Sequence, residues 1–418
     1  MWIITISFFL TIGLILLTMQ REYKLLALYN LTWFSVVLLC GLHLMSQVIY
    51  SDRVYIYVMI GGFAFNLGYL CFVKVRFCLN GRCINGDKEL ILNVKLLCLL
   101  LSFCIVFYLI QAYKVLLLLR GGIPLSTIRY SYFTQGKIMN PIETIISSWI
   151  TTPIVYYLII PINIWNVLNN TNTKAQKFIL SMSIANVVLY LFVTQAKQNL
   201  VYYLFSFSLA IFQFDIPKDY KRKIYKIVII VIIGMFLLNW TRKGEFSVNF
   251  IYTYVGTSMN LLDHWTKYVD VIGLRSYGLA FLYGLINIPM SFIKLINPNV
   301  FPFFYEIKDV INYMTSTGIE VFQGSGPINN VYVTNLLFFY LDGGKKGIAI
   351  CDFLFGICAG MASRKYVDSS NNLYTKIAYN ILGVGVLYTF ISWPLYNTSF
   401  LLSFIILKVL MQKSYTRI

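Results

Sequence analysis

The sequence has few charged side chains and few histidines. Only 12% of its 418 residues are Asp, Glu, Lys or Arg, about half the share in a typical soluble domain, and there are two histidines. A soluble core could not enclose so many separate apolar blocks. The blocks also lack the alternation of polar and apolar residues that a transmembrane β-barrel needs. His43 and His264 lie far apart, with no cluster of Cys or carboxylate residues, so we expect no metal and no cofactor.

The motifs of soluble catalysis are also missing. The sequence has no P-loop, no glycine-rich dinucleotide-binding pattern after a strand and no nucleophile elbow. The net charge of +18 would suggest nucleic acid in a soluble protein. Here the basic residues lie between apolar runs, so we expect no nucleic-acid partner and interpret the charge as a signal of membrane topology.

Long apolar runs recur along the whole chain, which is 58% hydrophobic with a mean hydropathy of +0.71. Runs of this kind cross about 30 Å of hydrocarbon as helices. The sequence predicts an all-α polytopic membrane protein, one integral membrane domain over 1–418 with about 11 transmembrane helices. They are expected at 1–19, 25–45, 54–73, 96–113, 144–167, 178–194, 199–213, 227–239, 347–363, 377–391 and 397–411.

The distribution of basic residues predicts which loops lie inside. Alternate loops, with the tail from Lys408, hold 20 of the 34 Lys and Arg but only six of the 16 acidic residues. By the positive-inside rule this side is cytoplasmic, so the N-terminus is expected outside and the C-terminus inside. Two further stretches, 271–293 and 329–341, are apolar enough to enter the membrane. If both span, there are 13 helices, but we favour segments that re-enter or lie against the bundle.

Two outer loops are long enough to carry function. Loop 114–143 is the first, and loop 240–346 is the second, rich in Tyr, Phe, Trp and Gly with balanced charge. That composition is not typical of disorder, so we expect the second loop to fold onto the bundle and form a cleft at the outer face.

Basic residues in these outer regions are candidates for phosphate binding, since the positive-inside rule disfavours them there. Arg with adjacent Gly lets a forked donor approach phosphate oxygens. Each could instead anchor or snorkel to lipid headgroups. The candidates are Arg120, Arg129, Lys197, Arg242, Lys243 and Arg275.

Other outer residues have both a functional and a structural interpretation. His264 could be a general base near pH 7 or a satisfied surface histidine. The Gly324–Thr334 segment, with Asn329 and Asn330, could bind sugar hydroxyls or form a helix cap. Asp352 lies inside a predicted span, where hydrogen bonds to nearby loop groups would explain a buried carboxylate.

Two local motifs resemble a known family. The first runs Asn330-Val331-Tyr332-Val333-Thr334, then Tyr340-Leu341-Asp342-Gly343-Gly344, and a span ending at Arg364-Lys365. The second is Gly121-Gly122-Ile123-Pro124-Leu125-Ser126 with Arg129. With the layout of spans, they resemble the oligosaccharide repeat-unit polymerases, the Wzy-type O-antigen polymerases. The chain departs from the family pattern where Asp342-Gly343-Gly344 replaces Asp-Phe-Gly and where Lys197 replaces an Arg.

The resemblance implies an enzyme that joins undecaprenyl-diphosphate-linked oligosaccharides at the periplasmic face of the bacterial inner membrane, for O-antigen, capsule or exopolysaccharide. A sugar hydroxyl of the acceptor attacks the anomeric carbon of the growing chain, and the lipid diphosphate leaves. It also implies membrane lipids, a chain-length regulator and a flippase as partners.

The same resemblance implies roles for particular residues. The six outer cations would bind the diphosphate, and Arg129 would also act in catalysis. His264 or a carboxylate such as Asp263 or Glu245 would be the base. Sugars would contact Tyr252, Tyr254, Trp265, Asn329, Asn330, Tyr340 and Asp342. An O-antigen ligase-like glycosyltransferase shares this layout and remains an alternative. A lipid-linked oligosaccharide flippase or other transporter is a third reading, disfavoured because the unexplained charges lie in the outer loops.

Overall fold

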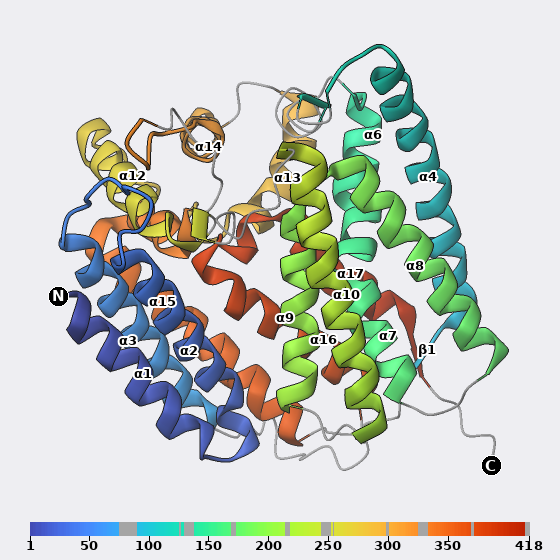
Figure 1. The fold of residues 1–418 in the computed structure, drawn as a ribbon, viewed down its shortest axis with the longest axis horizontal. Helices are drawn as coiled ribbons and strands as arrows, with labels where there is room; N and C mark the ends of the chain where they lie inside the picture. Colours follow the sequence, from blue (N-terminus) through green and yellow to red (C-terminus); the bar gives the residue numbers. More distant parts are fainter. Residues whose placement is uncertain are drawn as a thin grey trace. The chain divides into compact units, whose positions relative to one another are not determined.

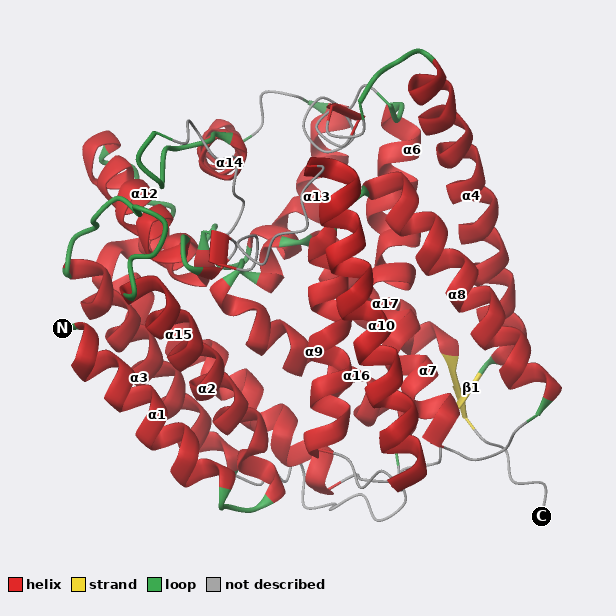
Figure 2. Ribbon diagram, in the orientation of Figure 1, coloured by secondary structure: helices red, strands yellow, loops and turns green. Residues whose placement is uncertain are grey.

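The fold is helical throughout most of the described chain (Figure 1 and Figure 2). The computed structural model describes residues 1–74, 90–124, 127–128, 138–168, 173–213, 218–243, 252–253, 255–297, 301–324, 333–368 and 372–413. The chain divides into two compact units. Unit 1 comprises Met1–Phe77, Val248–Asp368 and Gly385–Thr398, and unit 2 comprises Cys78–Ser247, Ser369–Val384 and Ser399–Ile418.

Unit 1 begins with three antiparallel apolar helices and adds the helices of the second long loop. Its elements are α1 (Trp2–Leu17), η1 (Arg21–Tyr23), α2 (Lys24–Gly41), α3 (Arg53–Val73), α12 (Ser258–Ile272), α13 (Tyr283–Ile296), α14 (Pro302–Ser316), α15 (Thr334–Asp368), η5 (Tyr388–Phe390) and η6 (Pro394–Tyr396). Trp393 lies at its core, with its ring 5.0 Å from Phe281 and 4.7 Å from both Phe339 and Phe355.

Unit 2 holds the remaining helices. They are α4 (Val94–Arg120), α6 (Pro141–Ile146), η3 (Ser147–Thr151), η4 (Pro153–Leu158), α7 (Ile159–Leu168), α8 (Lys174–Thr194), α9 (Lys197–Gln213), α10 (Lys218–Lys243), most of α16 (Leu373–Leu387) and most of α17 (Thr398–Leu410). Strands β1 (Leu90–Leu92) and β2 (Met411–Lys413) pair antiparallel. Helices α6, η3, η4 and α7 form one continuous rod, with π-type turns around Pro153, whose missing N–H cannot join an α-helical ladder.

Six helices are long and apolar enough to cross a membrane, three in each unit among the described residues. They are Arg21–Gly41, Arg53–Val73 and Thr334–Asp368 in unit 1, and Val94–Arg120, Pro141–Trp165 and Lys174–Thr194 in unit 2. Shorter apolar helices include Trp2–Leu17 and Thr398–Leu410. The prediction of an all-helical membrane protein is confirmed at this level, because helices of such length and composition match the thickness of a bilayer.

Helices α3 and α15 pack together through glycines. A Cβ on Gly356 of α15 would overlap the carbonyl oxygen of Phe65, and one on Gly360 would overlap that of Tyr69. Gly68 of α3 meets the Phe353 carbonyl in the same way. Small residues let two membrane helices approach until their backbones touch. In lipid this close van der Waals contact stabilises the helix pair, because there is no hydrophobic driving force between the helices.

We expect Gly356→Ala to destabilise the protein by about 1–3 kcal/mol, because the methyl group must push the two backbones apart. Gly234→Ala in α10 is the matched control: its new Cβ would meet only Leu200, at 3.8 Å, and alanine is the better helix former by about 1 kcal/mol. Thermal unfolding in detergent should show a lower midpoint for Gly356→Ala alone. Equal midpoints for the two variants would contradict the close contact.

Helix α15 turns back on itself near its start. Gly343 and Gly344 have non-helical angles, with φ of +62° at Gly344, so a short segment, 334–342, precedes the long segment 345–368. The Asn335 amide donates to Asp352 at 2.9 Å, although the residues are 17 positions apart, and Gly347 lies against the Phe339 carbonyl. The two segments therefore form a helical hairpin with its turn at Gly343-Gly344.

The hairpin explains two features of the sequence. Every residue from Val333 to Asp342 is at most 5% exposed, as expected for a helix enclosed by protein on all sides. Asp352, the carboxylate inside a predicted span, accepts a hydrogen bond from Asn335 of this segment. Gly61 of α3 leaves room for the second Asp352 oxygen. The longer segment 345–368 is about 36 Å long by itself, enough to cross a bilayer.

The described parts of the two long loops are mostly helical. Helix α4 continues to Arg120, so the first loop starts later than the predicted residue 114. The second loop contains α12, α13, α14 and the short arm of the hairpin, and α10 extends to Lys243 at its start. These described residues of the second loop are therefore largely helical.

Candidate functional site

Several predicted site residues lie outside the described part of the chain. They are Arg129, Glu245, Tyr254, Asn329 and Asn330. For three others only the backbone is described: Lys197 begins α9, and Arg242 and Lys243 end α10. Arg120 is the last residue of α4, in unit 2. The remaining predicted residues all belong to unit 1: Tyr252, Asp263, His264, Trp265, Arg275, Tyr340 and Asp342.

The site in unit 1 is built around one face of α12. Asp263, Lys267 and Asp270 recur at i, i+4 and i+7, so they project from the same side of the helix. The face between them and the core carries Met259, Leu262 and Val269, all fully buried. This amphipathic pattern fixes the rotation of α12 and directs its charged residues toward the start of α3.

Arg53, the first residue of α3, meets this charged face. Its Nε lies 2.9 Å from Asp263 Oδ1, and one terminal nitrogen lies 3.7 Å from Asp270 Oδ2. Lys267 Nζ lies 2.7 Å from the other Asp263 oxygen, and the Ser51 amide also donates to it. The Asp263 side chain is only 6% exposed. Both Asp263 oxygens are bonded and the side chain is nearly enclosed, so this geometry does not favour the catalytic role predicted for Asp263.

Arg275 follows α12 and faces the same group of charges. Its Nη2 lies 3.0 Å from Asp270 Oδ1, and its guanidinium stacks over the Tyr340 ring at 5.2 Å. The Tyr340 hydroxyl donates to both Asp270 oxygens, at 2.8 and 2.9 Å. The prediction placed Arg275 and Tyr340 in one site, and the structure brings them together through Asp270.

The hairpin turn of α15 contributes another cation. Lys345 Nζ lies 5.9 Å over the ring of Tyr57, one turn along α3 from Arg53. Gly344 lies beside Arg275: a Cβ on it would be 3.9 Å from Nη2. We call Arg53, Lys267, Arg275 and Lys345 the cation cluster. With only Asp263 and Asp270 among these contacts, its positive charge is not fully balanced.

Asp342 holds the Arg275 segment against the hairpin. Its Oδ1 accepts hydrogen bonds from the Ser276 hydroxyl (2.5 Å) and from the amides of Gly278 (2.8 Å) and Ala280 (3.0 Å). Its Oδ2 accepts from the Phe281 amide at 2.8 Å. Both carboxylate oxygens of Asp342 therefore bind groups of the 276–281 segment. This leaves no free oxygen for a sugar, contrary to the predicted role of Asp342. It positions the loop that carries Arg275.

One donor in this arrangement is unused. Arg275 Nη1 is buried and has no hydrogen-bond partner among the described residues. A buried guanidinium N–H without an acceptor costs free energy unless a ligand supplies one. Guanidinium groups prefer the paired oxygens of carboxylates and phosphates. An oxyanion is the kind of acceptor that would satisfy Arg275 Nη1.

His264 and Trp265 occupy other faces of α12. His264 is exposed, with its ring edge-on to Trp265 at 4.7 Å, and partial desolvation lowers its pKa from the ordinary value. Among the described contacts, the His264 imidazole makes no hydrogen bond or ion pair with the cation cluster. Trp265 is 1% exposed and packs against Tyr268 and Tyr313, so it offers no free face to a sugar.

Tyr252 lies in a small core of its own. It packs with Val321 and Phe322, and its hydroxyl donates to Gln47 at 2.6 Å. The Leu44 amide donates to the same hydroxyl at 2.8 Å, while burial raises the pKa of Tyr252. These contacts tie the α2–α3 loop to the start of the α12 region. A stacking role with sugars, as predicted, does not fit this enclosed ring.

The sequence interpretation missed Arg53, Lys267, Asp270, Tyr57 and Lys345. The spacing of Asp263, Lys267 and Asp270 on one helical face was an available signal. Arg53 was visible as a cation at the outer end of a predicted span, where such charges are disfavoured. Lys345 could not be assigned, because its proximity to Tyr57 depends on the hairpin turn.

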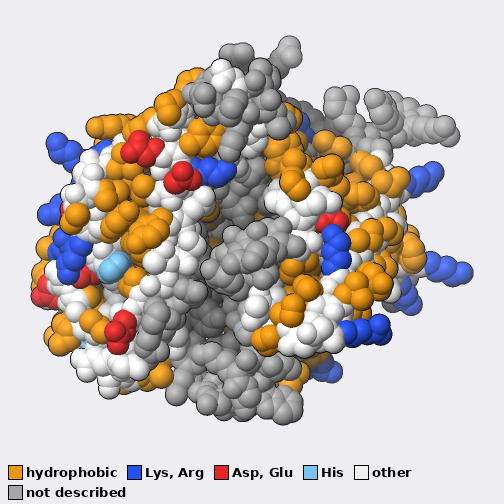
Figure 3. All heavy atoms as spheres, turned by 90° about the horizontal axis from the view of Figure 1, so that it is seen from above, with side chains coloured by type: hydrophobic (Ala, Val, Ile, Leu, Met, Phe, Trp, Pro, Cys, Tyr) orange, Lys and Arg blue, Asp and Glu red, His pale blue; other side chains and the backbone are white. Residues whose placement is uncertain are grey.

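Figure 3 looks onto the top of Figure 1, the end at which α12 and α14 lie. Acidic and basic side chains lie among apolar ones over the unit 1 part of this face. Within the described part of the chain, no three His, Cys, Asp or Glu side chains gather where they could hold a metal ion.

Comparison with protein-family models, characterised proteins and solved structures finds no match for this chain.

Proposed function

We propose that the chain is a membrane glycosyltransferase that polymerises undecaprenyl-diphosphate-linked oligosaccharide repeat units. The observation that carries this proposal is the buried Arg275 Nη1 within the cation cluster, which has no hydrogen-bond partner among the described residues. An oxyanion site at one end of a bundle of apolar helices suits a phosphorylated lipid, whose charge stays at the membrane surface while its chain stays in hydrocarbon.

The ends of unit 1 support the placement of the site outside. At the end opposite the cation cluster, Arg364 lies 3.1 Å from Glu22, and the Tyr69 hydroxyl bonds to Ser363 and to the Glu22 carbonyl. That end also carries Arg21, Lys24 and Lys365. The positive-inside rule assigns it to the cytoplasm, and the cation cluster then faces the periplasm.

Helix length and burial favour eleven membrane crossings over thirteen. Helix α13 has 14 residues, about 21 Å, which is short for a full span. The hairpin arm 334–342 starts level with Asp352 and rises to the turn, so it fits a re-entrant segment that does not cross. Non-helical backbone near its start is tolerated in a membrane only where protein encloses it, and Val333 and Thr334 are fully buried.

The proposed reaction displaces the lipid diphosphate. A sugar hydroxyl of one lipid-linked unit attacks the anomeric carbon of the growing chain on another. The new carbon–oxygen bond forms as the bond to diphosphate breaks, and the electron pair passes to the departing oxygen. Arg275 and Lys345 stabilise that charge electrostatically. Undecaprenyl diphosphate is released, and the lengthened chain remains on the acceptor lipid.

The hydroxyl proton needs a base near the diphosphate. Both Asp263 and Asp270 contact two cations, but the Asp270 side chain is 39% exposed and the Asp263 side chain only 6%, so a substrate hydroxyl can reach Asp270. We therefore assign the base to Asp270 rather than to His264 or Asp263. The Tyr340 hydroxyl, bonded to both Asp270 oxygens, orients that carboxylate.

Reconstitution tests this function. The purified chain in liposomes, given undecaprenyl-diphosphate-linked repeat units alone, should yield a ladder of products that differ by one repeat unit. A single transfer to a different lipid acceptor would contradict polymerisation and indicate a ligase. Movement of the lipid-linked unit across the bilayer with no new glycosidic bond would indicate a flippase.

A further inference from the structure

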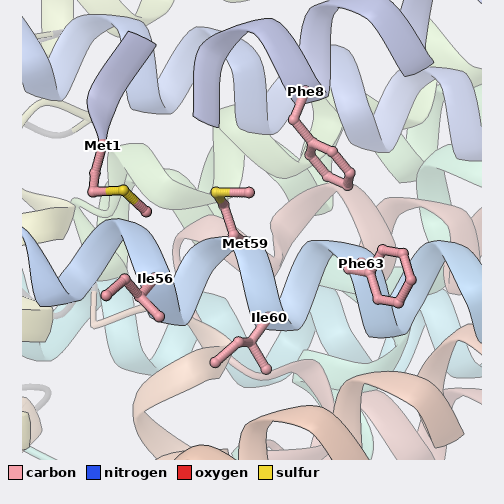
Figure 4. A pocket seen from close by; sticks show the side chains of 6 residues that line it. All are labelled: Met1, Phe8, Ile56, Met59, Ile60 and Phe63. Atoms are coloured by element: carbon pink, nitrogen blue, oxygen red, sulfur yellow. The ribbon is translucent and has the colours of Figure 1, made fainter. Parts of the chain in front are cut away.

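An apolar groove of about 340 Å³ lies between α1 and α3 in unit 1 (Figure 4). Met1, just before α1, and Phe8 of α1 reach toward the α3 side chains in this view. The α3 residues that line it are Ile56, Met59, Ile60 and Phe63. Carbon and thioether groups form its walls, so only hydrocarbon matches its chemistry.

The groove lies on the same face of α3 as Arg53. Arg53, Ile56, Ile60 and Phe63 follow the spacing i, i+3, i+7 and i+10, which places them in one stripe along the helix. Ile56 is 37% exposed and Phe63 is 60% exposed. By the helix rise, Ile56 is about 5 Å and Phe63 about 15 Å along the axis from Arg53. The groove therefore starts one turn from the cation cluster.

Two cations lie near the polar end of the groove. Arg53 leads the stripe, and Lys345 lies over the ring of Tyr57, the neighbour of Ile56. A ligand that suits both regions has an anionic head and an unbranched or methyl-branched hydrocarbon chain. Charge complementarity selects a lipid phosphate over a neutral lipid, and the excess of the four cations over the two carboxylates Asp263 and Asp270 suits the charge of a diphosphate.

We propose that the α1–α3 groove holds the isoprene units next to the diphosphate of the polyprenyl carrier that binds at the cation cluster. The proposal rests on the proposed function, since the glycosyl donor supplies the lipid diphosphate. The groove positions the chain more than it tightens binding, because surrounding lipid tails are as apolar as its walls. Alignment of the chain fixes where the diphosphate and the anomeric carbon lie beside Arg275.

Photo-crosslinking tests the groove without relying on activity. The probe is a polyprenyl diphosphate with a diazirine in its second isoprene unit, added to the full chain in liposomes. A phosphatidylglycerol with a diazirine on its acyl chain is the comparison. The diphosphate probe should label the peptide that spans Arg53–Val73 at least about fivefold more than the phosphatidylglycerol probe does.

A filled groove provides the second measurement. Ile60→Trp places a larger ring in the groove and should reduce labelling of that peptide by the diphosphate probe several-fold. Leu109→Trp, at a position 52% exposed on α4, is the matched control and should leave labelling unchanged. In the ladder assay Ile60→Trp should lower kcat several-fold with a smaller change in the donor KM, since the groove aligns the chain while the cation cluster still binds the diphosphate.

The results of these experiments distinguish a failure of the groove proposal from a failure of the polymerase proposal. Equal labelling by both probes, or labelling unaffected by Ile60→Trp, would overturn the groove proposal even if a ladder forms. Selective labelling that Ile60→Trp abolishes supports the groove. If no ladder forms under the same conditions, the polymerase proposal fails while the lipid diphosphate site stands.

Discussion

Arg275→Ala is expected to lower the rate of polymerisation by about 10²–10³-fold, the usual cost of removing one donor to a charge that develops in the transition state. Arg275 supplies the guanidinium whose Nη1 has no protein acceptor among the described residues. Arg275→Lys should recover part of the rate, because it restores the charge but not the paired donors. The rate of ladder formation with saturating lipid-linked substrate measures both variants.

Arg222→Ala in α10 is the control for this experiment. Arg222 is 81% exposed and pairs only loosely with Asp219 at 3.9 Å, so its loss should change neither rate nor folding. Size-exclusion profiles and thermal midpoints show whether each variant is folded. A folded Arg275→Ala that polymerises at the wild-type rate would remove Arg275 from the site.

Asp342→Ala is expected to destabilise unit 1 by about 3–5 kcal/mol, in the range for breaking a buried charged network. The substitution leaves the Ser276 hydroxyl and the amides of Gly278, Ala280 and Phe281 without their acceptor. Asp342→Asn should be intermediate: its oxygen can keep three of these bonds, while its NH₂ group would face the Phe281 amide. Protein yield and thermal midpoint in detergent measure the effect.

Glu306→Ala is the matched carboxylate control, since Glu306 is exposed on α14. It should leave the free energy of unfolding within about 0.5 kcal/mol of wild type. If Asp342→Asn is fully stable but loses activity with unchanged substrate KM, the carboxylate acts in chemistry and not as a support. Wild-type stability for Asp342→Ala would contradict the hydrogen-bond arrangement itself.

The membrane helices could be predicted from the sequence because their signal is local. Predicted spans 54–73, 178–194 and 199–213 end within a few residues of α3, α8 and α9. Each depends on an uninterrupted apolar run, which any helix in lipid requires. The predicted start at 347 was less accurate, since the long arm of α15 begins at the Gly343-Gly344 turn and carries Lys345 at its head.

The site could be predicted only in part because its contacts are distant in the sequence. Arg275 was selected as an unexplained outer cation, but its partners Asp270 and Tyr340 come from α12 and from the hairpin. Asp342 was selected as a motif residue. Its role as an acceptor for 276–281 depends on a turn more than 60 positions away. The burial of Trp265 and Tyr252 likewise depends on tertiary packing. A loop rich in aromatic residues does not show which of its rings are buried.

The most direct test counts undecaprenyl diphosphate released for each glycosidic bond formed by the reconstituted chain. We expect one lipid diphosphate per added repeat unit, with release and chain growth lost together in Arg275→Ala. Chain growth without diphosphate release, or diphosphate release without a ladder of lengthened chains, would contradict it.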